Sequence, residues 1–360
     1  MEKQPAILFF YNYSSTFIKK DIAILSTKFT VHTHDFYTAN KLLTPFRLLS
    51  QKFFLLKNLW KADLFICQFA GYHSVLPALF GKIFGKPCLV IVGGTDAHFF
   101  PGIGYGNWQK GLLRKATVFT FKLCSHIAPK HRSLMSCHYT YDKNEPVEQG
   151  IYARMRGLKT PFTEIPNGYD TLLWQCTQQK KKGTFITIST GWEYPSQKQL
   201  KGIDLLLEVA PQFPECTFTI LGVPDKTILG EVPANVQLLA PVKHNNLIDI
   251  LSTQEFYMQL SVAEGFPNAI CEAMLCECVP IGSDVFSIPE IVGNTGFILK
   301  ERSAEKLKAL IAEALQSNLP ELGNAARKRI ADNYTIESRS KLLIELCGKL
   351  IKQKAMFFFT

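Results

Sequence analysis

The sequence predicts an α/β protein of two halves, each with its own parallel sheet. Short continuous apolar runs alternate with longer segments of helical spacing, which is the pattern of strand–helix–strand units. The pattern restarts after residue 183, and a chain of 360 residues corresponds to about two domains of ordinary size. We therefore predict two Rossmann-like domains.

The individual elements follow from the spacing of apolar residues. In the first half, buried strands are predicted at 6–11, 64–67 and 88–92, and a helix follows the first of them at 17–25. In the second half, strands are predicted at 184–189, 216–221, 236–239, 256–262 and 279–281, and helices at 202–209, 246–251, 268–276, 304–315, 321–333 and 336–352.

Proline and glycine mark the junction of the two halves. Pro161, Pro166 and Gly168 cluster around residues 165–169, and no periodic pattern crosses them. We predict domains at 1–165 and 166–335, with Lys180 to Lys182 as a solvated turn before the second sheet.

Charge is distributed unevenly along the chain. Residues 1–160 hold 21 Lys and Arg against 8 Asp and Glu, a net +13, whereas the other 200 residues carry −3. Nucleic acid, an anionic membrane and a phosphorylated acceptor are candidate partners of the basic half. The 47% of apolar residues exclude a disordered chain. No apolar run reaches the ~18–20 residues of a spanning helix, and the first residues do not resemble a signal peptide. The ten irregularly spaced cysteines predict reduced thiols.

The sharpest motif is Glu264-Gly-Phe-Pro-Asn-Ala-Ile-Cys-Glu272, at a predicted strand-to-helix turn. Loops at the carboxyl ends of parallel strands bind ligands in doubly wound sheets. Gly265 allows close backbone approach, and Pro267 suits the start of a helix, where free N–H groups favour a phosphate. Ionised carboxylates accept hydrogen bonds from sugar or ribose hydroxyls. The motif therefore predicts a site for a phosphorylated sugar.

This segment resembles the Glu-x7-Glu signature of the retaining glycosyltransferases of family 4 (glycosyl transferases group 1), which have the GT-B fold. Residues 165–170 look like the family's interdomain Pro-Asn-Gly-x-Asp segment, Lys201-Gly202 like the start of its donor-domain helix, and residues 288–296 like its Pro-Glu…Gly-Phe run. The first half matches weakly. The resemblance implies an acceptor domain, a nucleotide-sugar domain facing it across a cleft, and a last helix, 336–360, that returns to the first domain.

The resemblance implies roles for single residues. Glu272 would hold the nucleotide ribose, Glu264 would contact a hydroxyl of the donor sugar, and Lys201 would neutralise the diphosphate leaving group. Val242 matches a position whose backbone meets the base. The diphosphate or sugar would lie along the donor segment Gly265, Phe266, Pro267, Asn268 and Ala269.

One departure concerns the positive charges of the donor site. The family usually has an Arg about five residues before the Lys, but here Trp192 follows Gly191, nine positions before Lys201. Lys198 would supply the second cation from this longer loop, or the site would function with one. A pseudo-enzyme is the alternative.

In the first half, Gly93-Gly94-Thr95-Asp96 and His98 follow a strand. A purely structural turn would explain the glycines. As a loop facing the donor domain, it would instead place Asp96, or His98, to orient the acceptor or a donor hydroxyl. The loop with Ser14 and Ser15 lacks the family's glycines, so its role stays open.

Two basic, aromatic-rich segments, 45–61 and 108–122, predict attachment to an anionic membrane surface, with helices packed on their own sheet as the alternative. No nucleic-acid module is visible, which disfavours that partner. Cys276-Glu-Cys278 lacks a second pair for a metal site, and His126, His131 and His138 lack ligand spacing, so these are predicted to be core or solvated residues.

We expect a retaining, metal-independent hexosyltransferase with no cofactor. It would move a sugar from a nucleotide diphosphate sugar to a glycan or lipid-linked acceptor in bacterial-type surface polysaccharide assembly, at the cytoplasmic face of the membrane. The alternatives are a nucleotide-sugar epimerase of the same fold and a non-catalytic nucleotide-sugar binder.

Overall fold

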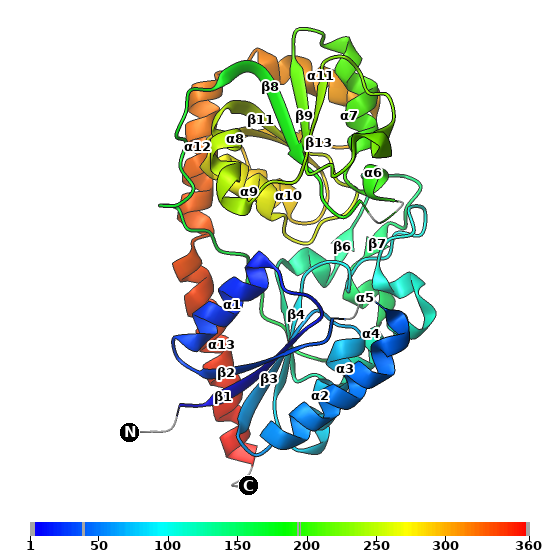
Figure 1. Ribbon diagram of the computed structural model, residues 1–360, viewed down its shortest axis with the longest axis vertical. Helices are drawn as coiled ribbons and strands as arrows, with labels where there is room; N and C mark the ends of the chain where they lie inside the picture. The colour runs from blue at the N-terminus through cyan, green and yellow to red at the C-terminus, as the bar shows by residue number, and fades with distance from the viewer. Residues whose placement is uncertain (1–3, 38–39, 193, 195, 358–360) are drawn as a thin grey trace.

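The computed structural model shows two α/β domains, one above the other in Figure 1, and describes residues 4–37, 40–192, 194 and 196–357. The first domain has a parallel five-stranded sheet of order β2-β1-β3-β4-β5. Its strands are β1 (Ala6–Tyr11), β2 (Thr30–Asp35), β3 (Ala62–Gln68), β4 (Cys88–Val92) and β5 (His126–Pro129). Strand β2 was not predicted, because this edge strand consists largely of polar residues.

Helices cover both faces of this sheet, as alternate side chains of its strands require. Ile7 and Phe9 face α1 (Thr16–Ser26) and the last helix, α13 (Ile336–Phe357). Leu8 and Phe10 point to the other face, toward α2 (Thr44–Asn58), α3 (Tyr72–Ile83) and α4 (Gly111–Leu123). Smaller elements follow β5, namely the hairpin of β6 (Cys137–His138) and β7 (Glu148–Gln149), and α5 (Ile151–Arg154).

The second domain has a parallel six-stranded sheet of order β10-β9-β8-β11-β12-β13. Phe185 of its central strand β8 stacks between Phe218 and Phe256 of the neighbouring strands, with ring centroids 4.8 and 4.4 Å apart. The strands are β8 (Lys181–Ile188), β9 (Thr217–Leu221), β10 (Val236–Leu239), β11 (Gln254–Gln259), β12 (Val279–Ser283) and β13 (Phe297–Leu299). The helices are α6 (Gln197–Leu200), α7 (Ile203–Val209), α8 (Leu247–Ser252), α9 (Asn268–Leu275), α10 (Ile288–Val292), α11 (Ala304–Leu315) and α12 (Leu319–Asn333).

Two details of this domain differ from the sequence prediction. The turn predicted at Lys180 to Lys182 is wrong, because β8 begins at Lys181 and the Lys180 ammonium donates to the carbonyls of Leu251 and Cys276, whereas Lys181 and Lys182 are exposed as predicted. Strand β11 ends at Gln259 rather than Val262, so the loop that carries Glu264 is longer than expected.

The last helix crosses back to the first domain, as predicted. Backbone hydrogen bonds join Tyr169 to Tyr334 and Ile336, at 2.9 and 3.0 Å, so the two crossing segments lie side by side (Figure 1). From α13, the buried Arg339 binds both carboxylate oxygens of Asp21, at 2.8 and 2.7 Å, and the carbonyls of Ile165 and Pro166. This network ties the domain junction to α1.

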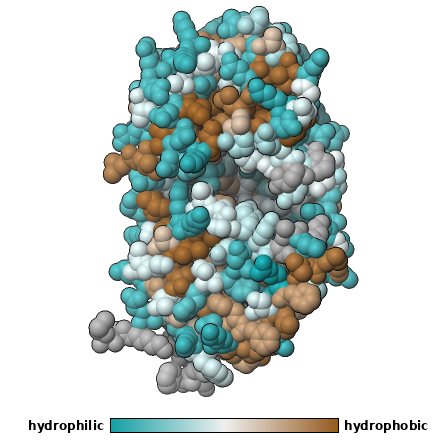
Figure 2. All heavy atoms as spheres, viewed as in Figure 1, coloured by the Kyte–Doolittle hydropathy of each residue, from teal (hydrophilic) through white to brown (hydrophobic). Residues whose placement is uncertain are grey.

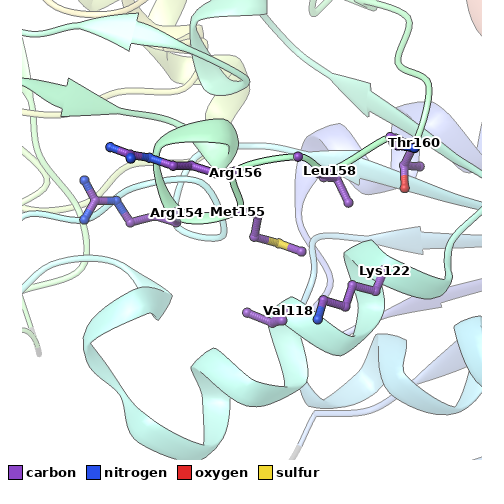
Figure 3. Close-up of a pocket in the computed structure, with 9 residues that line it drawn as sticks. Val118, Lys122, Arg154, Met155, Arg156, Leu158 and Thr160 are labelled. Atoms are coloured by element: carbon purple, nitrogen blue, oxygen red, sulfur yellow. The ribbon is translucent and has the colours of Figure 1, made fainter.

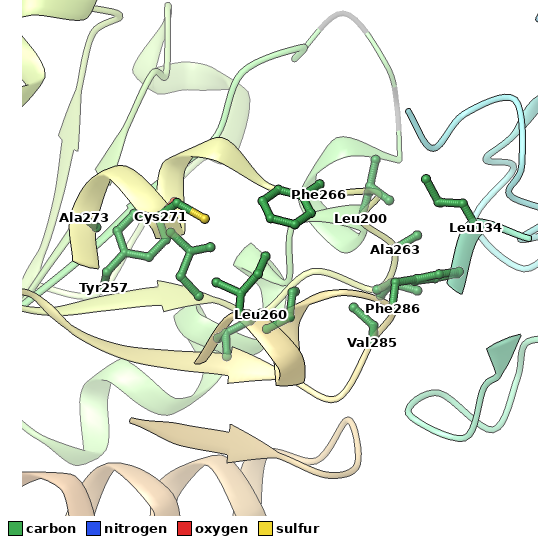
Figure 4. Close-up of a cluster of buried hydrophobic side chains, with 14 of the residues drawn as sticks. Leu134, Leu200, Tyr257, Leu260, Ala263, Phe266, Cys271, Ala273, Val285 and Phe286 are labelled. Atoms are coloured by element: carbon green, nitrogen blue, oxygen red, sulfur yellow. The ribbon is translucent and has the colours of Figure 1, made fainter. Parts of the chain in front are cut away.

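Apolar side chains also meet between the domains. Leu134 of the first domain lies opposite Ala263 and Phe286 of the second (Figure 4). The ring of Phe286 is 4.4 Å from that of His98, and the Tyr139 hydroxyl donates to the carbonyl of Val262 at 3.1 Å. The contact brings the carboxyl edges of the two sheets together.

Candidate functional site

Glu264 and Lys201 form an ion pair at the carboxyl edge of the second sheet. The Lys201 ammonium donates to Oε1 of Glu264, which also accepts from Ser261 and Gln259 at 3.0 and 3.1 Å. Both side chains are mostly buried: that of Lys201 is 23% exposed and that of Glu264 is 14% exposed. Three donors converge on one carboxylate oxygen, so Glu264 is held as an anion beside a cation.

Glu272 lies one turn inside α9, and its carboxylate faces a histidine. Nε2 of His244 is 2.9 Å from Oε1 of Glu272, and the His244 ring packs edge-on against Trp174. The Glu272 side chain is only 6% exposed, whereas that of His244 is 32% exposed. His244 was not predicted; its place two residues after Val242 in the same loop was the available signal.

The start of α9 is fixed by the interdomain segment. Oδ1 of Asn268 accepts from the Asn167 amide and the Tyr169 hydroxyl, each at 2.9 Å, and Asn167 also donates to the carbonyl of Phe266. Pro267 occupies the N-cap position. Residues 167–169 thus position the backbone of the donor segment. The first N–H groups of α9, which have no acceptor within the helix, lie at the domain junction.

The glycine loop of the first domain contacts the Glu264 loop of the second. A Cβ atom placed on Gly265 would lie 1.8 Å from the Gly93 carbonyl oxygen, and one placed on Gly94 would lie 3.4 Å from the Gly265 nitrogen. Two backbones approach this closely only where neither residue carries a side chain. The glycines that the sequence singled out in separate halves therefore meet.

Asp96 shapes this glycine loop. Its buried carboxylate accepts from the backbone amides of Ala70, Gly94 and Gly93, at 2.9, 3.2 and 3.3 Å. Burial raises the pKa of Asp96, and the three amide hydrogen bonds oppose that shift. Because the Asp96 side chain has no exposed surface, its role in this conformation is to hold the backbone of the glycine loop in place.

His98 has two buried ring nitrogens, and neither has a hydrogen-bond partner within the described residues. Burial lowers the pKa of His98 to about 3, so the imidazole is neutral. A buried polar group without a partner is rare in proteins and often marks a ligand site. The ring touches Gly94 and Phe286, so it lies at the domain contact.

The remaining predicted residues lie at the rim of this region. Val242 and Lys198 are exposed, and Trp192 donates its indole N–H to the carbonyl of Ser189 at 3.0 Å. Thr95 and Ser14 are exposed as well, and the hydroxyl of Ser15 at the start of α1 is buried without a partner. No contact in the described part of the chain assigns Lys198 to the site.

A second polar contact joins the domains at Glu290 of the Pro-Glu motif. Its carboxylate is 3.2 Å from Nε2 of the buried His131 and pairs with the Arg132 guanidinium, while Glu164 lies 3.9 Å from the same nitrogen. The side-chain atoms of His131, Glu164 and Glu290 that could bind a metal ion lie within 4.8 Å of one another. Because Arg132 already neutralises Glu290, we interpret the group as an interdomain ion pair network.

Replacing Glu290 with glutamine is expected to lower the free energy of unfolding by about 1 kcal/mol, because it removes the charge that His131 and Arg132 share. Urea denaturation followed by circular dichroism measures this. The exposed Glu231→Gln, at a position outside the helices and strands, serves as a matched control and is expected to leave the unfolding midpoint unchanged. Equal midpoints for all three proteins would contradict the contact's contribution.

A family model matches the part of the chain that holds most of this site. Residues 195–333 match the model described as "Glycosyl transferases group 1". This segment, less than half of the chain, is similar to the group 1 glycosyl transferases. It contains Lys201, Glu264 and Glu272 together with the whole α9 start.

Curated relatives match this chain over part of their length. The chain is 27% identical over 162 residues to a phosphatidylinositol N-acetylglucosaminyltransferase subunit of Arabidopsis thaliana, covering 42% of this chain and 36% of that protein. It is 25% identical over 227 residues to the GtfA subunit of a UDP-N-acetylglucosamine–peptide N-acetylglucosaminyltransferase of Streptococcus pneumoniae, covering 59% and 44%. The matches thus span less than half the length of these relatives.

Solved structures resemble the whole chain. HepE of Anabaena, in complex with UDP-glucose, aligns with a TM-score of 0.73 at 14% identity, covering 96% of this chain and 99% of that one. Sucrose-phosphate synthase of Thermosynechococcus elongatus aligns with a TM-score of 0.70 at 14% identity, covering 97% and 100%. These likenesses confirm the predicted GT-B fold.

Proposed function

We propose that this protein is a retaining, metal-independent glycosyltransferase that takes its sugar from a nucleotide diphosphate sugar. The observation that carries the proposal is the meeting of the two glycine loops. This contact joins the loop of Glu264, which pairs with Lys201, to the loop of the first domain that carries Asp96 and His98, and Glu272 lies in the helix that follows the Glu264 loop. A ligand bound beside this contact would touch both domains.

The charges of the second domain suit such a donor. The α9 amides and Lys201 offer positive charge to a diphosphate, and the Glu272 carboxylate accepts from ribose hydroxyls once His244 yields that oxygen. Glu264 would release Lys201 to the diphosphate and take a sugar hydroxyl instead. The ion pair seen here would therefore be exchanged for ligand contacts on binding.

The proposed reaction is a substitution on one face of the sugar. The acceptor hydroxyl oxygen forms a bond to the anomeric carbon while the bond to the diphosphate breaks, and the hydroxyl proton passes to the leaving phosphate oxygen. Lys201 stabilises the charge that develops on that phosphate, and the loops position the two substrates. The contact between the domains excludes water from the reacting atoms.

The relatives suggest which donor to test first. Several are named as N-acetylglucosaminyltransferases, and HepE was solved with UDP-glucose. We therefore propose a UDP-sugar, with UDP-N-acetylglucosamine and UDP-glucose as first candidates. The acceptor is proposed to be a glycan or a lipid-linked sugar in surface polysaccharide assembly.

A thermal-shift assay with UDP and these two donors tests the donor assignment. A ligand at about 100 times its Kd adds ~2.7 kcal/mol to the free energy of unfolding. Glu272→Ala is expected to weaken UDP binding about tenfold, since it removes a charged acceptor of ribose hydrogen bonds. The exposed Glu208→Gln of the same domain is the control. No stabilisation of the unsubstituted protein by any nucleotide diphosphate would refute the proposal.

The acceptor domain carries a surface that suits an anionic membrane. Phe46, Leu49, Phe53, Leu56 and Trp60 follow one another at helical spacing along α2 and just after it, and all are exposed, by 44 to 84%. Brown spheres gather at the lower right of Figure 2, where Figure 1 shows α2. Exposed cations flank this apolar stripe, namely Arg47, Lys52, Lys57 and Lys61. An exposed apolar stripe edged by cations is typical of helices that lie in a membrane surface.

Acidic residues are almost absent around the stripe. From residue 36 to residue 141 the only acids are Asp63 and Asp96, so α2, α3 and α4 carry none. A pocket of about 520 Å³ beside α4 is lined by Lys122, Arg154, Arg156 and Lys159 without an acidic residue (Figure 3). No helix in the described part of the chain is long and apolar enough to cross a membrane. We propose that the stripe attaches the protein peripherally at the cytoplasmic face.

Replacing Phe46, Phe53 and Trp60 together with serine is expected to reduce binding to vesicles of phosphatidylglycerol and phosphatidylcholine by more than about 100-fold. Each buried large apolar side chain contributes about 1.5–3 kcal/mol. Sedimentation of protein with vesicles measures binding. Serine at the exposed Leu172, Leu173 and Ile228 of the second domain is the matched control. Equal sedimentation of both variants, or no binding at low salt, would sink the membrane proposal.

A further inference from the structure

Lys130 is a buried cation for which the proposed donor site has no use. It directly follows β5 and is 4% exposed. Within the described residues its ammonium has no ion pair and no hydrogen bond; instead it lies 3.9 Å from the centroid of the Phe17 ring and 5.9 Å from that of Phe69. Aromatic faces attract a cation but do not satisfy its three N–H donors.

The carboxylates nearest to Lys130 are already occupied. Asp21 is bound at both oxygens by Arg339, and Asp96 accepts from three backbone amides. Burial, followed by the charge of Arg339, lowers the pKa of Lys130 to about 7, and Asp21 and Asp96 only partly oppose this. An uncompensated buried charge is costly, so an anion brought to this ammonium would be stabilised.

Lys130 lies directly behind the meeting point of the glycine loops. The Phe69 ring beside it fills the space next to Gly93, where an added Cβ would lie 1.9 Å from the ring. Gly93 in turn contacts Gly265 of the donor domain. Only one ring and one glycine therefore separate Lys130 from the donor segment.

The start of α1, the helix whose Phe17 ring contacts Lys130, adds further unused donors. Phe17, which contacts Lys130, is the second residue of α1, and Ser15 is its N-cap. The Ser15 side chain makes no capping hydrogen bond, its buried hydroxyl has no partner in the described structure, and the first turn contains no acidic residue. The first amides of a helix have no acceptor within the helix, and they favour an anion.

We propose that Lys130, the Ser15 hydroxyl and the first amides of α1 form a phosphate site on the acceptor side of the cleft. The inference rests on the proposed function and narrows its acceptor to a molecule with a phosphate group close to its reacting hydroxyl. Lys201 and the start of α9 already serve the donor diphosphate from the opposite domain. A second phosphate, bound in the first domain, therefore belongs to the acceptor.

Inorganic phosphate, titrated into the full chain saturated with UDP, tests the site by calorimetry. Lys130→Met is expected to weaken phosphate binding about tenfold or more, since it removes a charged hydrogen-bond donor, and to change the UDP Kd by less than about twofold. Lys130→Arg is expected to retain phosphate binding. Lys28→Met, at an exposed position just after the opposite end of α1, is expected to behave as the unsubstituted protein.

Ser15→Asp is a variant that is expected to keep or raise the stability of the fold and to abolish phosphate binding. Aspartate is a good N-cap and favours the helix dipole, so the variant is expected to fold at least as stably. Its negative charge is expected to abolish phosphate binding. Unchanged phosphate binding in both Lys130→Met and Ser15→Asp overturns the proposal. A loss of UDP affinity equal to the loss of phosphate affinity overturns the acceptor assignment, because the site then serves the donor. Failure of UDP to bind the unsubstituted protein contradicts the proposed function instead, and phosphate titration without UDP still tests Lys130.

Discussion

Gly265→Ala is expected to reduce kcat/KM about 100-fold, the loss that a displacement of about 1 Å in an active site can cause. The added Cβ would lie 1.8 Å from the Gly93 carbonyl oxygen. Because the neighbouring atom belongs to the backbone, no side-chain rotation relieves the overlap, and the loops must move apart. Steady-state transfer from the donor identified by thermal shift measures the effect. UDP binding is expected to change less than transfer, since Glu272, the proposed ribose ligand, lies inside α9 and not at the contact between the loops.

Gly348→Ala separates this effect from the general effect of an added methyl group. Gly348 lies in α13, with nothing within 4 Å of an added Cβ. Alanine there is expected to raise the free energy of unfolding by about 0.4–1 kcal/mol and to leave transfer unchanged. Full activity of Gly265→Ala would mean that the contact between the glycine loops plays no part in the reaction.

The second half of the chain was predictable because its chemistry lies in one continuous segment. Glu264 and Glu272 belong to a single strand-to-helix turn, and such turns lie at the carboxyl edge of a parallel sheet wherever the neighbouring strands pair. Lys201 could be placed beside them only through the resemblance. The structure brings Lys201 onto Glu264, although 63 positions separate them in the chain.

Contacts between distant segments were not predictable from local patterns. His244 meets Glu272, and His131 meets Glu290 across the domain junction, yet spacing along the chain says nothing about either pair. The burial of Lys130 was not predicted, because a lysine after a strand ordinarily reaches solvent. Strand β2 was not predicted, because an edge strand needs no continuous apolar run.

Asp96 shows how a sequence can single out a residue without fixing its contacts. The sequence places an acid beside two glycines at the end of a strand, which suits substrate binding and loop shaping equally well. In the structure the buried carboxylate accepts hydrogen bonds from the backbone amides of Ala70, Gly93 and Gly94, which supports the role in loop shaping. The acid thus keeps Gly93 and Gly94 in place against Gly265.

Glu264→Ala is expected to reduce kcat by about 100-fold to 1,000-fold, the range observed when one preorganised electrostatic group is removed from an active site. Before the donor binds, the carboxylate gathers Lys201, Ser261 and Gln259 on one oxygen, so its loss removes the group that holds Lys201 in position for the leaving phosphate, together with the proposed acceptor of a sugar hydroxyl. Glu272→Ala is expected to act mainly on the donor KM, because Glu272 would bind the ribose far from the reacting bond. Steady-state kinetics with varied donor separates the two parameters, and Glu208→Gln is the control. An equal rise in KM with unchanged kcat in both variants would assign the two carboxylates to binding alone and contradict the role given to Glu264.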